Sequence, residues 1–436
     1  MPRGVTAASG VPQATRPVST PWSPTLILAS GTCGGLVERR DEGRGAPTGS
    51  VARKLGDIAA AADLRRVHLL AWRDLDDPEA GGSEIHAHQI ASMWAAAGLD
   101  VTLRTSFASG HPRLGRRNGY RVVRKAGRYM VFPRAALGEV TRRYGRADGL
   151  VEIWNGMPFF SPLWTTGPRV IFLHHLHAEM WDMTLPPHLA HLGRFVEARL
   201  APPLYRHETV VTLSETSKQE LVDDMGFATE RVRVVVPGVD ARFTPGGDRA
   251  PTPLVVAVGR LVPVKRFHLL VDALAAVKVR VPELEAVIVG EGYEREAIEA
   301  QIATRRADDW IHLVGHVDDD ELIDLYRRAW VLASTSAREG WGMTITEAAA
   351  CGTPAVATDI AGHRDAVRAG QSGMLVEPNA DFASALEQVL TDEGLRARLS
   401  AGAIERAAAC TWEATAVGTL EALASDARRR RRRRRA

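Results

Sequence analysis

The sequence predicts an α/β protein built from two domains, each with a parallel sheet covered by helices. Three observations lead to this prediction. The chain has 436 residues, which is long for one domain and comfortable for two. Short runs of Val, Ile and Leu alternate with helical segments, as strands buried on both faces of a parallel sheet do. The alternation pauses at residues 245–253, which are rich in Pro and Gly, and then starts again.

The first series of strands begins at residue 67. Its first member, residues 67–72, is a continuous apolar run that leads into a loop containing Gly81 and Gly82. Ser83 is a suitable N-cap for a helix that runs to Ala97 and ends at Gly98. Further strands of this series are expected at residues 101–103, 150–153, 170–173 and 210–213.

The second series begins at residues 254–258, and a helix is expected from about Phe267. Further strands are expected at residues 286–289, 311–314, 331–334 and 355–357. The two series predict two Rossmann-like domains facing a cleft. Because open parallel sheets bind ligands beyond the carboxyl ends of their strands, we expect the functional residues in the loops directly after these strands.

The composition indicates a globular cytoplasmic protein. No stretch approaches the roughly 18 consecutive apolar residues of a membrane span, and the apolar run at residues 26–29 is short for a secretory signal. Only three cysteines occur, widely spaced, which argues against a disulfide framework or a zinc module and fits a reducing compartment.

The two ends of the chain are predicted to lack packed structure. Residues 1–64 are rich in Pro, Gly, Ser, Thr and Arg without sustained periodicity, so we expect a mostly disordered extension with one short helix near residues 58–62. Residues 428–435 are eight consecutive arginines. Because like charges repel and nothing apolar can be buried there, residues 428–436 are predicted to be a solvated tail.

Positive charge is also concentrated in the first domain. Residues 101–147 hold twelve Lys and Arg against the single acid Glu139. This surface and the arginine tail are either ordinary solvated surfaces or sites of peripheral contact with an anionic membrane, at the inner membrane face. The basic segments lack interleaved aromatic residues and any recognisable nucleic-acid module, so we expect no specific nucleic-acid partner.

The first candidate for chemistry is residues 258–266, at the end of the first strand of the second domain. Arg260 offers a planar fork of donors and Lys265 a point charge, and both lie beside the start of a helix. That combination suits a diphosphate. Taken alone, the segment could equally be a solvated basic turn.

The second candidate is residues 339–347, after the strand at 331–336. Glu339 is followed by Gly340 and Gly342, which expose backbone amides, and a helix begins near Met343. The amides and the positive end of the helix would face an anionic oxygen. Glu347 lies one turn into that helix, where it could accept hydrogen bonds from vicinal hydroxyls. The alternative is a loop glutamate and a helix-capping glutamate without a ligand.

These motifs, taken in order, resemble the retaining glycosyltransferases of family four, which have the GT-B fold. The order is Gly81-Gly82, then G-R-L-x-x-x-K, then E-G-x-G and a second Glu, and the resemblance runs from about residue 67 to residue 415. Residues 237–240 with Phe243 resemble the family's segment that closes the first domain. Residues 411–413 resemble the start of its last helix, which crosses back. The resemblance implies an acceptor-binding domain over residues 65–245, a nucleotide-sugar-binding domain over 246–410 and a crossing helix over 411–427.

The resemblance also implies a nucleotide-sugar donor and a role for each candidate residue. Arg260 and Lys265 would neutralise the departing diphosphate, Glu339 would contact hydroxyls of the donor sugar, and Glu347 would bind the ribose. Further donor contacts are implied for Gly81, Gly82, Gly340, Trp341, Gly342, Met343 and Thr344 and, around the base, for Gly315, His316 and Val317. The family more often has Phe where Trp341 stands, a departure that could reshape the sugar pocket.

Three histidines, His174, His175 and His177, follow the strand at residues 170–173. The family has a histidine here near the reacting sugar, and its offset from Pro168 matches it to His174. That imidazole could donate a hydrogen bond or stabilise charge in the transition state. We expect His175 and His177 to line the acceptor side. A metal site that adds residues 179 and 182 is an alternative without a fourth ligand at a familiar spacing.

The resemblance implies transfer with retention of configuration, without an established protein nucleophile, through an oxocarbenium-like state. Because Lys and Arg would replace a metal ion, neither a metal nor a cofactor is expected. The expected donor is a UDP- or GDP-sugar, and the expected acceptor is a saccharide, a lipid-linked compound or a small molecule. The alternatives are a nucleotide-sugar epimerase, a phosphorylase and a non-catalytic donor binder.

Two other enzyme classes fit less well. A metal-dependent transferase would use residues 74–76 or 318–320, but the second run is better explained as the capped start of a helix at 321–328. A dinucleotide oxidoreductase needs a third glycine that residues 290–292 do not supply.

Overall fold

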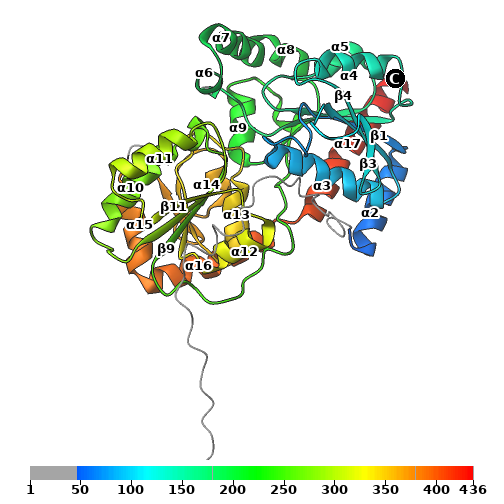
Figure 1. Ribbon diagram of the computed structural model, residues 1–436. Coiled ribbons are helices and arrows are strands. Elements are labelled where there is room, and N and C mark those ends of the chain that lie inside the picture. Colours follow the sequence, from blue (N-terminus) through cyan, green and yellow to red (C-terminus); the bar gives the residue numbers. More distant parts are fainter. Residues whose placement is uncertain (1–46, 179, 379, 436) are drawn as a thin grey trace, which may run out of the picture. The chain divides into compact units, whose positions relative to one another are not determined.

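A computed structural model describes residues 47–435 of the chain, apart from residues 179 and 379. The part of the expected N-terminal extension before residue 47 therefore lies outside the described residues. Within them are two sheets of mostly parallel strands covered by helices on both faces, which confirms the predicted fold class (Figure 1).

The first sheet has eight strands in the order β3-β4-β2-β1-β5-β6-β7-β8. All neighbouring strands are parallel except β3 and β4, which are antiparallel. The strands are β1 (Arg66–Leu70), β2 (Asp100–Ser106), β3 (Leu114–Arg117), β4 (Tyr120–Ala126), β5 (Gly149–Trp154), β6 (Arg169–Leu173), β7 (Val210–Thr212) and β8 (Val232–Val234). Strands β5 and β6 are buried along their whole length, as their continuous apolar sequences predict.

The helices of this domain connect the strands and cover the sheet. They are α2 (Gly49–Ala61), α3 (Gly82–Ala96), α4 (Val131–Val140), α5 (Ser161–Trp164), α6 (Met180–Thr184), α7 (Pro187–Phe195), the π-helical turn η1 (Val196–Leu200), α8 (Pro202–Tyr205), α9 (Glu215–Asp223) and the 3₁₀ turn η2 (Thr229–Arg231).

The second sheet has six parallel strands in the order β11-β10-β9-β12-β13-β14. They are β9 (Leu254–Val258), β10 (Glu285–Val289), β11 (Ile311–Gly315), β12 (Val331–Ser334), β13 (Ala355–Thr358) and β14 (Gly373–Val376). The connecting helices are the 3₁₀ turn η3 (Pro263–Lys265), α10 (Phe267–Lys278), α11 (Arg295–Thr304), α12 (Asp319–Arg328), α13 (Met343–Ala350), α14 (His363–Ala366), α15 (Phe382–Thr391) and α16 (Glu393–Ala408).

The capped helix expected after residue 318 is present. The Asp318 carboxylate accepts hydrogen bonds from the backbone amides of Asp320 and Glu321, and α12 follows. The acidic run at 318–320 is therefore a helix start, which removes the reading of that run as a metal motif.

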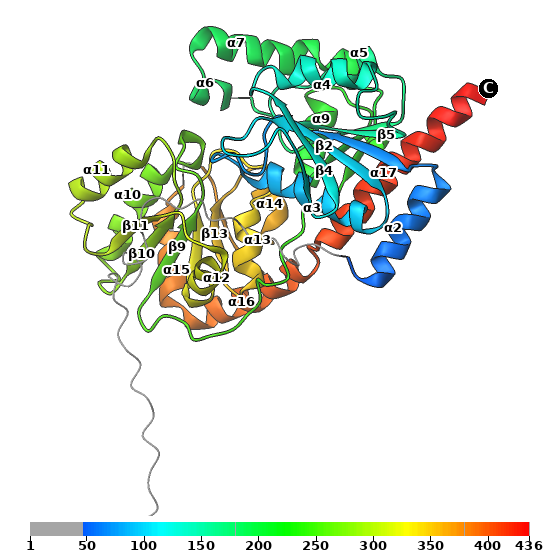
Figure 2. The same cartoon turned by 45° about the vertical axis from the view of Figure 1, so that its right-hand side comes forward.

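The last helix, α17 (Trp412–Arg435), packs on the first domain although it follows the second in sequence. Figure 2 shows it beside α2 and below the first sheet. The indole of Trp94 in α3 donates a hydrogen bond to the carbonyl of Ala416, 3.0 Å away. No helix among the described residues is both long and apolar enough to cross a membrane.

Helix α2 is longer than the short helix expected near residues 58–62. It begins at Gly49, because its buried Leu55 and Ala59, one turn apart, pack on α17. Without knowledge of that packing partner, the segment looks like part of a disordered extension.

The arginine run also differs from the prediction, because it continues α17 as helix to Arg435. Residues 429–431 of the run form ion pairs with carboxylates. Arg429 and Arg430 contact the buried carboxylate of Asp426, Arg430 also reaches Glu208, and Arg431 pairs with Asp63. Residues 432–435 are exposed.

Asp426 is the anchor of this helix end. Its carboxylate also accepts hydrogen bonds from the Arg169 backbone amide at 3.0 Å and the Thr209 hydroxyl at 3.2 Å. The side chain of asparagine in its place would direct its NH₂ donor towards groups that are themselves hydrogen-bond donors.

We therefore expect Asp426→Asn to lower the free energy of unfolding by about 2–4 kcal/mol. The matched control is Asp63→Asn, which removes an exposed partner of the same arginine run and should leave the thermal midpoint unchanged within error. Thermal unfolding followed by circular dichroism measures both, and equal midpoints for the two variants would contradict an anchoring role of Asp426.

Candidate functional site

The end of β9 and the turn after it hold Lys265 in a fixed position. Gly259 follows the strand, and η3 ends at Lys265. The Lys265 backbone is fixed on both sides, since its amide donates to the Val262 carbonyl at 2.9 Å and its carbonyl accepts from the Thr335 hydroxyl at 3.1 Å. The next residue, Arg266, adopts the left-handed conformation at φ 50° and starts α10.

Lys265 forms an ion pair with Glu339, which lies in the loop after β12. The Ser336 hydroxyl donates a second hydrogen bond to the same carboxylate oxygen, 3.0 Å away. Burial opposes ionisation of Glu339. Electrostatic attraction to Lys265 and His363 and the hydrogen bonds from Lys265 and Ser336 outweigh burial, and together they lower the pKa of Glu339 to about 2. The structure thus brings together two of the residues that the sequence predicted, with Glu339 ionised at neutral pH.

The loop at 339–342 lies against the first domain at the end of β6. A Cβ at position 340 would collide with the His174 carbonyl oxygen, so only glycine fits there. Gly342 has φ 99° and starts α13, which leaves the amides of the first turn of that helix at the loop.

Trp341 anchors this loop. Its side chain is buried, and its indole donates a hydrogen bond to the Thr346 hydroxyl at 2.7 Å. The guanidinium of Arg406 lies over the ring. The side chain that stands where the family more often has Phe therefore packs against α13 and Arg406. Its effect on the sugar pocket stays a prediction.

Glu347 lies at the second turn of α13. The Tyr326 hydroxyl donates a hydrogen bond to its carboxylate, 3.1 Å away. Burial raises the pKa of Glu347 to about 7, and the Tyr326 hydrogen bond only partly opposes this shift. The two glutamates therefore differ in charge near neutral pH: Glu339 is an anion and Glu347 titrates.

At Gly81 and Gly82 the first domain approaches Arg260 and the start of α13 in the second domain. Gly81 precedes α3, and a Cβ on it would lie 4.0 Å from Arg260 Nε. A Cβ on Gly82 would lie 2.8 Å from Met343 Sδ. The Gly81 amide donates to Glu84 at 2.8 Å, which fixes the turn. The glycine turn of the first domain thus lies against the side chains of Arg260 and Met343 of the second.

Gly315, His316 and Val317 follow β11 at the carboxyl edge of the second sheet. Gly315 has φ 76°, and its carbonyl accepts a hydrogen bond from the Gly290 amide at 2.8 Å. Val317 is buried and His316 exposed. These residues lie at the sheet edge from which the other candidate loops also emerge.

The three histidines after β6 separate into two groups. The ring of His174 faces into the first domain, where its Nε2 lies 3.0 Å from Nδ1 of His86. The ring of His86 in turn stacks on Trp412, at the start of α17. The side chain of His174 is therefore turned away from the Lys265–Glu339 pair, and only its backbone reaches the loop at 340.

His175 and His177 form the second group. Their rings stack at 4.9 Å with an interplanar angle of 14°. Burial lowers the pKa of His175 to about 4, and the charges of Glu339 and Lys265 also act on it. Burial likewise lowers the pKa of His177, and the charges of Arg338 and Arg260 contribute. Of the three imidazoles, His175 is the one exposed to the field of the ion pair.

Two further cationic residues of the site, Arg73 and Arg338, were not identified from the sequence. Arg73 follows β1 and is buried, and its guanidinium donates hydrogen bonds to the backbone carbonyl and the carboxylate of Glu79. Burial lowers the pKa of Arg73, and the positive charge of Arg260 lowers it further. The place of Arg73 after a strand was the signal that could have found it.

Arg338 precedes Glu339 and links the two domains. It donates to the Leu176 carbonyl at 2.6 Å and pairs with Glu220 of α9 at 2.7 Å. No pattern in the sequence marks it.

Asp74 and Asp76, the other candidate metal motif, form ion pairs with arginines. The Asp74 carboxylate is fully buried with Arg124 at 3.0 Å, and Asp76 pairs with Arg117. Among residues 47–178, 180–378 and 380–435, no group of three or more His, Cys, Asp and Glu is arranged to hold a metal ion. Asp182 pairs with Arg194, and residue 179 is outside the described residues.

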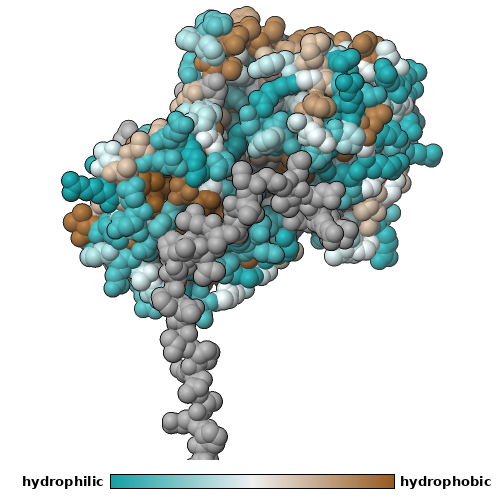
Figure 3. All heavy atoms as spheres, viewed as in Figure 1, coloured by the Kyte–Doolittle hydropathy of each residue, from teal (hydrophilic) through white to brown (hydrophobic). Residues whose placement is uncertain are grey.

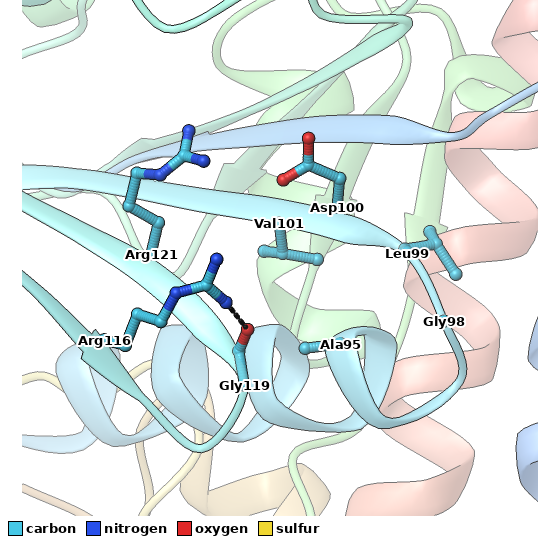
Figure 4. A pocket seen from close by; sticks show the side chains of 8 residues that line it. All are labelled: Ala95, Gly98, Leu99, Asp100, Val101, Arg116, Gly119 and Arg121. Carbon is cyan, nitrogen blue, oxygen red and sulfur yellow. Dashed lines mark hydrogen bonds between the residues drawn. The ribbon is translucent and has the colours of Figure 1, made fainter.

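A pocket of about 270 Å³ lies elsewhere in the first domain. Figure 4 shows Arg116, Arg121 and Asp100 around it, with Arg116 bonded to the Gly119 carbonyl. Asp100 is the first residue of β2, so the pocket lies at the amino edge of the parallel strands. It is therefore separate from the site formed by the loops at the carboxyl edge.

Two family profiles match consecutive parts of the chain. "Glycosyltransferase Family 4" matches residues 80–243, and "Glycosyl transferases group 1" matches residues 243–406. The junction at residue 243 falls between the last strand of the first sheet and the first strand of the second.

Curated relatives match over nearly their whole length. The D-inositol 3-phosphate glycosyltransferase of Kribbella flavida is 31% identical over 407 residues, which is 82% of this chain and 95% of the relative. The enzyme of the same name from Acidothermus cellulolyticus is 30% identical over 415 residues, which is 83% of this chain and 92% of the relative.

Solved structures share the fold. Sucrose-phosphate synthase from Thermosynechococcus elongatus aligns with a TM-score of 0.67 at 20% identity, over 81% of this chain and 96% of that chain. HepE of Anabaena, solved in complex with UDP and glucose, aligns with a TM-score of 0.62 at 20% identity, over 80% of this chain and 95% of that chain.

Asp365 of α14 offers a test of how the second domain holds the first. Its carboxylate accepts hydrogen bonds from the backbone amides of Glu215 and Thr216, both at 3.1 Å, and so caps α9 from the other domain. Asp365→Asn keeps one oxygen acceptor, so it should accelerate hydrogen exchange of one of these two amides about tenfold, the equivalent of one lost hydrogen bond.

The matched control is Asp381→Asn, which removes a cap within the second domain, where Asp381 accepts from the Ser384 amide. It should leave the exchange of α9 unchanged. If mass spectrometry finds no faster exchange of α9 in Asp365→Asn than in this control, the capping contact does not hold the domains together.

Proposed function

The chain belongs to the glycosyltransferases of family four with the GT-B fold, and we propose that it is a retaining enzyme that uses a nucleoside diphosphate sugar. A UDP-sugar is the first candidate donor, because HepE, which shares the fold, was solved with UDP. The acceptor supplies a hydroxyl group. The single observation that carries this proposal is the contact of Lys265 with Glu339, in the same domain as Arg260 and Met343, which the glycine turn of the opposite domain approaches.

The donor diphosphate would lie between the glycine turn of the first domain and the cations and helix amides of the second. Lys265 and Arg260 supply positive charge, the first turn of α13 supplies amides, and Gly82 leaves room for the phosphates beside Met343. Arg73 adds a third cation near Arg260. These groups stabilise the charge that develops as the sugar–phosphate bond breaks, which is the main demand of this reaction.

The sugar and the ribose would be held by the two glutamates. Glu339 stays ionised because of Lys265, so it can accept hydrogen bonds from sugar hydroxyls at any pH near neutral. When the diphosphate arrives, Lys265 can bridge the phosphate and Glu339, which keeps the pair in place. Glu347 would accept hydrogen bonds from the ribose hydroxyls.

For the histidine near the reacting sugar we propose His175 in place of His174. The field of Glu339 and Lys265 acts on His175, whereas the ring of His174 is engaged with His86. A lowered pKa keeps His175 neutral, so it can donate one hydrogen bond and does not add a positive charge next to the oxocarbenium-like state.

We further propose that no metal ion takes part and that the reaction occurs in the cytoplasm. Arg260 and Lys265 supply the charge that a metal would bring to the diphosphate. The thiols of Cys351 and Cys410 are buried and free, which fits a reducing compartment. Activity that is abolished by a chelator and restored by Mn²⁺ would contradict the first of these statements.

A panel of UDP, GDP, ADP and dTDP tests the donor site by thermal shift, because a ligand that binds only the native state raises the unfolding midpoint. Release of nucleoside diphosphate that requires an acceptor separates transfer from epimerisation. Stabilisation without any turnover would indicate a donor binder. A phosphorylase would release a sugar phosphate. Absence of stabilisation by all four nucleotides would rule out the donor site.

Lys265→Met should weaken UDP binding about 10- to 100-fold, because a charge-assisted hydrogen bond to phosphate is lost. Isothermal titration calorimetry measures the dissociation constant. Lys54→Met, in the exposed face of α2, is the control and should bind as the natural chain does. Equal affinities of the two variants would remove Lys265 from the diphosphate site.

The pKa of Glu347, about 7 in the free protein, predicts a pH dependence of donor binding. The pKa lies above the ordinary value, so the protonated form predominates below pH 7, and ribose hydroxyls donate best to the carboxylate formed above it. UDP affinity should therefore rise from pH 6 to pH 8, by at most about tenfold per pH unit.

In Glu347→Gln the group does not titrate, so the affinity should be lower and the rise across pH 7 should disappear. Glu299→Gln, on the exposed side of α11, should keep the rise. An identical pH profile in Glu347→Gln would show that another group causes the dependence.

A further inference from the structure

Helix α7 and the elements after it expose a row of large apolar side chains. We call this row the apolar ridge; its members are Leu163 of α5, Leu189, Leu192 and Phe195 of α7, and Leu200 of η1, which are between 43% and 66% exposed. Helices α7, α8 and α5 follow one another along one side of the first domain (Figures 1 and 2). The space-filling view shows apolar residues gathered over α7 (Figure 3). Contiguous apolar surface of this kind marks an interaction site.

The ridge is not a by-product of a helix that lacks a core face. The opposite face of α7 is already packed, since Ala190 is fully buried and a Cβ on Gly193 would lie 2.6 Å from the Trp181 ring. An ordinary surface helix shows polar residues on its outer face. The outer face of α7 carries the exposed imidazoles of His188 and His191, but Leu189, Leu192 and Phe195 make much of that face apolar.

Positive charge borders the ridge. Arg199 and Arg206 are exposed beside it, and Asp182, paired with Arg194, is the one exposed carboxylate within residues 180–207. The end of α17 adds to this border, because Arg429 donates to the His207 carbonyl at 3.2 Å in the loop after α8. Arginines 432–435 continue α17 beyond this contact, towards the side of the first domain away from α7 (Figures 1 and 2). Apolar side chains flanked by arginines match the acyl boundary and the phosphates of an anionic bilayer.

The buried side of α7 leads to the acceptor side of the site. The ring of Trp181 lies 5.0 Å from that of His177, which stacks on His175. The Glu197 carboxylate of η1 accepts from the amides of His177 and Ala178 at 2.8 and 3.0 Å. The ridge and the loop that carries the acceptor-side histidines are thus one packed unit.

These histidines also have free hydrogen-bonding atoms. Nε2 of His175 and Nδ1 of His177 are buried without a hydrogen-bond partner among the described residues. Buried polar atoms of this kind normally have a partner, and a bound hydroxyl compound would supply one.

We propose that the apolar ridge and its arginines dock the chain on an anionic lipid bilayer, and that the acceptor is a lipid-linked hydroxyl compound held in that bilayer. The inference rests on the proposed glycosyl transfer and names its acceptor class. The lipid part of the acceptor stays in the bilayer under α7, and its head group reaches His177 and His175 past Trp181.

Vesicle flotation tests the docking. The full chain should bind vesicles of phosphatidylcholine with 30% phosphatidylglycerol and bind pure phosphatidylcholine at least tenfold less. Leu192→Ser with Phe195→Ser should lower the binding to anionic vesicles about tenfold. The control, Leu269→Ser with Val279→Ser, changes two exposed apolar residues of the second domain and should bind as the natural chain does. Arg199→Ser with Arg206→Ser should weaken binding mainly at low salt.

UDP binding and the thermal midpoint are measured on every variant, so that a folding defect is recognised. If UDP binds and the ridge variant floats as well as the control, docking is wrong and the proposed function stands. If UDP does not bind the natural chain, the proposed function fails first. A ridge variant that turns a dimer into a monomer in light scattering would make the ridge a protein interface.

The acceptor class is tested with the labelled donor sugar. Label should enter a lipid extract in the presence of vesicles made from bacterial lipids, and the ridge variant should lose this transfer while it keeps UDP affinity. Transfer to soluble inositol 3-phosphate at equal rates in the ridge variant and the control, with none to lipid, would overturn the proposal.

Discussion

The site depends on the close approach of two backbones at Gly340. The loop after β12 can lie against the end of β6 only because position 340 has no Cβ to meet the His174 carbonyl. Gly362 allows the same approach on the other side, where a Cβ would lie 2.5 Å from the Glu339 carbonyl. Held between the two, Glu339 has one position, and it meets Lys265 there. The amides of α13 and the glycine turn of the first domain then face the same space.

Much of this arrangement could be predicted because it depends on local patterns. Runs of Val and Ile marked most of the strands, and the rule that ligands bind beyond the carboxyl ends of parallel strands placed Lys265 and Glu339 at one sheet edge. Their ion pair, which the structure contains, agrees with that rule. The β3–β4 hairpin had an equally local signal in Asn118-Gly119, both at positive φ in the turn, which the strand patterns alone did not reveal.

Other features depend on partners that the local sequence does not contain. His174 and His175 are neighbours at a strand end, and successive side chains there point to opposite sides, so the sequence does not tell which one faces Glu339. The arginine run was treated as self-repelling because its partners are distant. Glu208 and Asp63 precede Arg430 and Arg431 by 222 and 368 residues. Which arginines are packed and which are exposed follows only from the fold.

The return of α17 to the first domain also fixes the order in which the molecule can be completed during synthesis. The strands of the first sheet end at Val234, but the helix that covers Trp94 and Leu55 begins at Trp412. At typical translation rates the ribosome needs on the order of ten to forty seconds for the residues between them. During that interval the apolar surface around Trp94 and Leu55 has no cover, so the domain that is made first is the last to be finished.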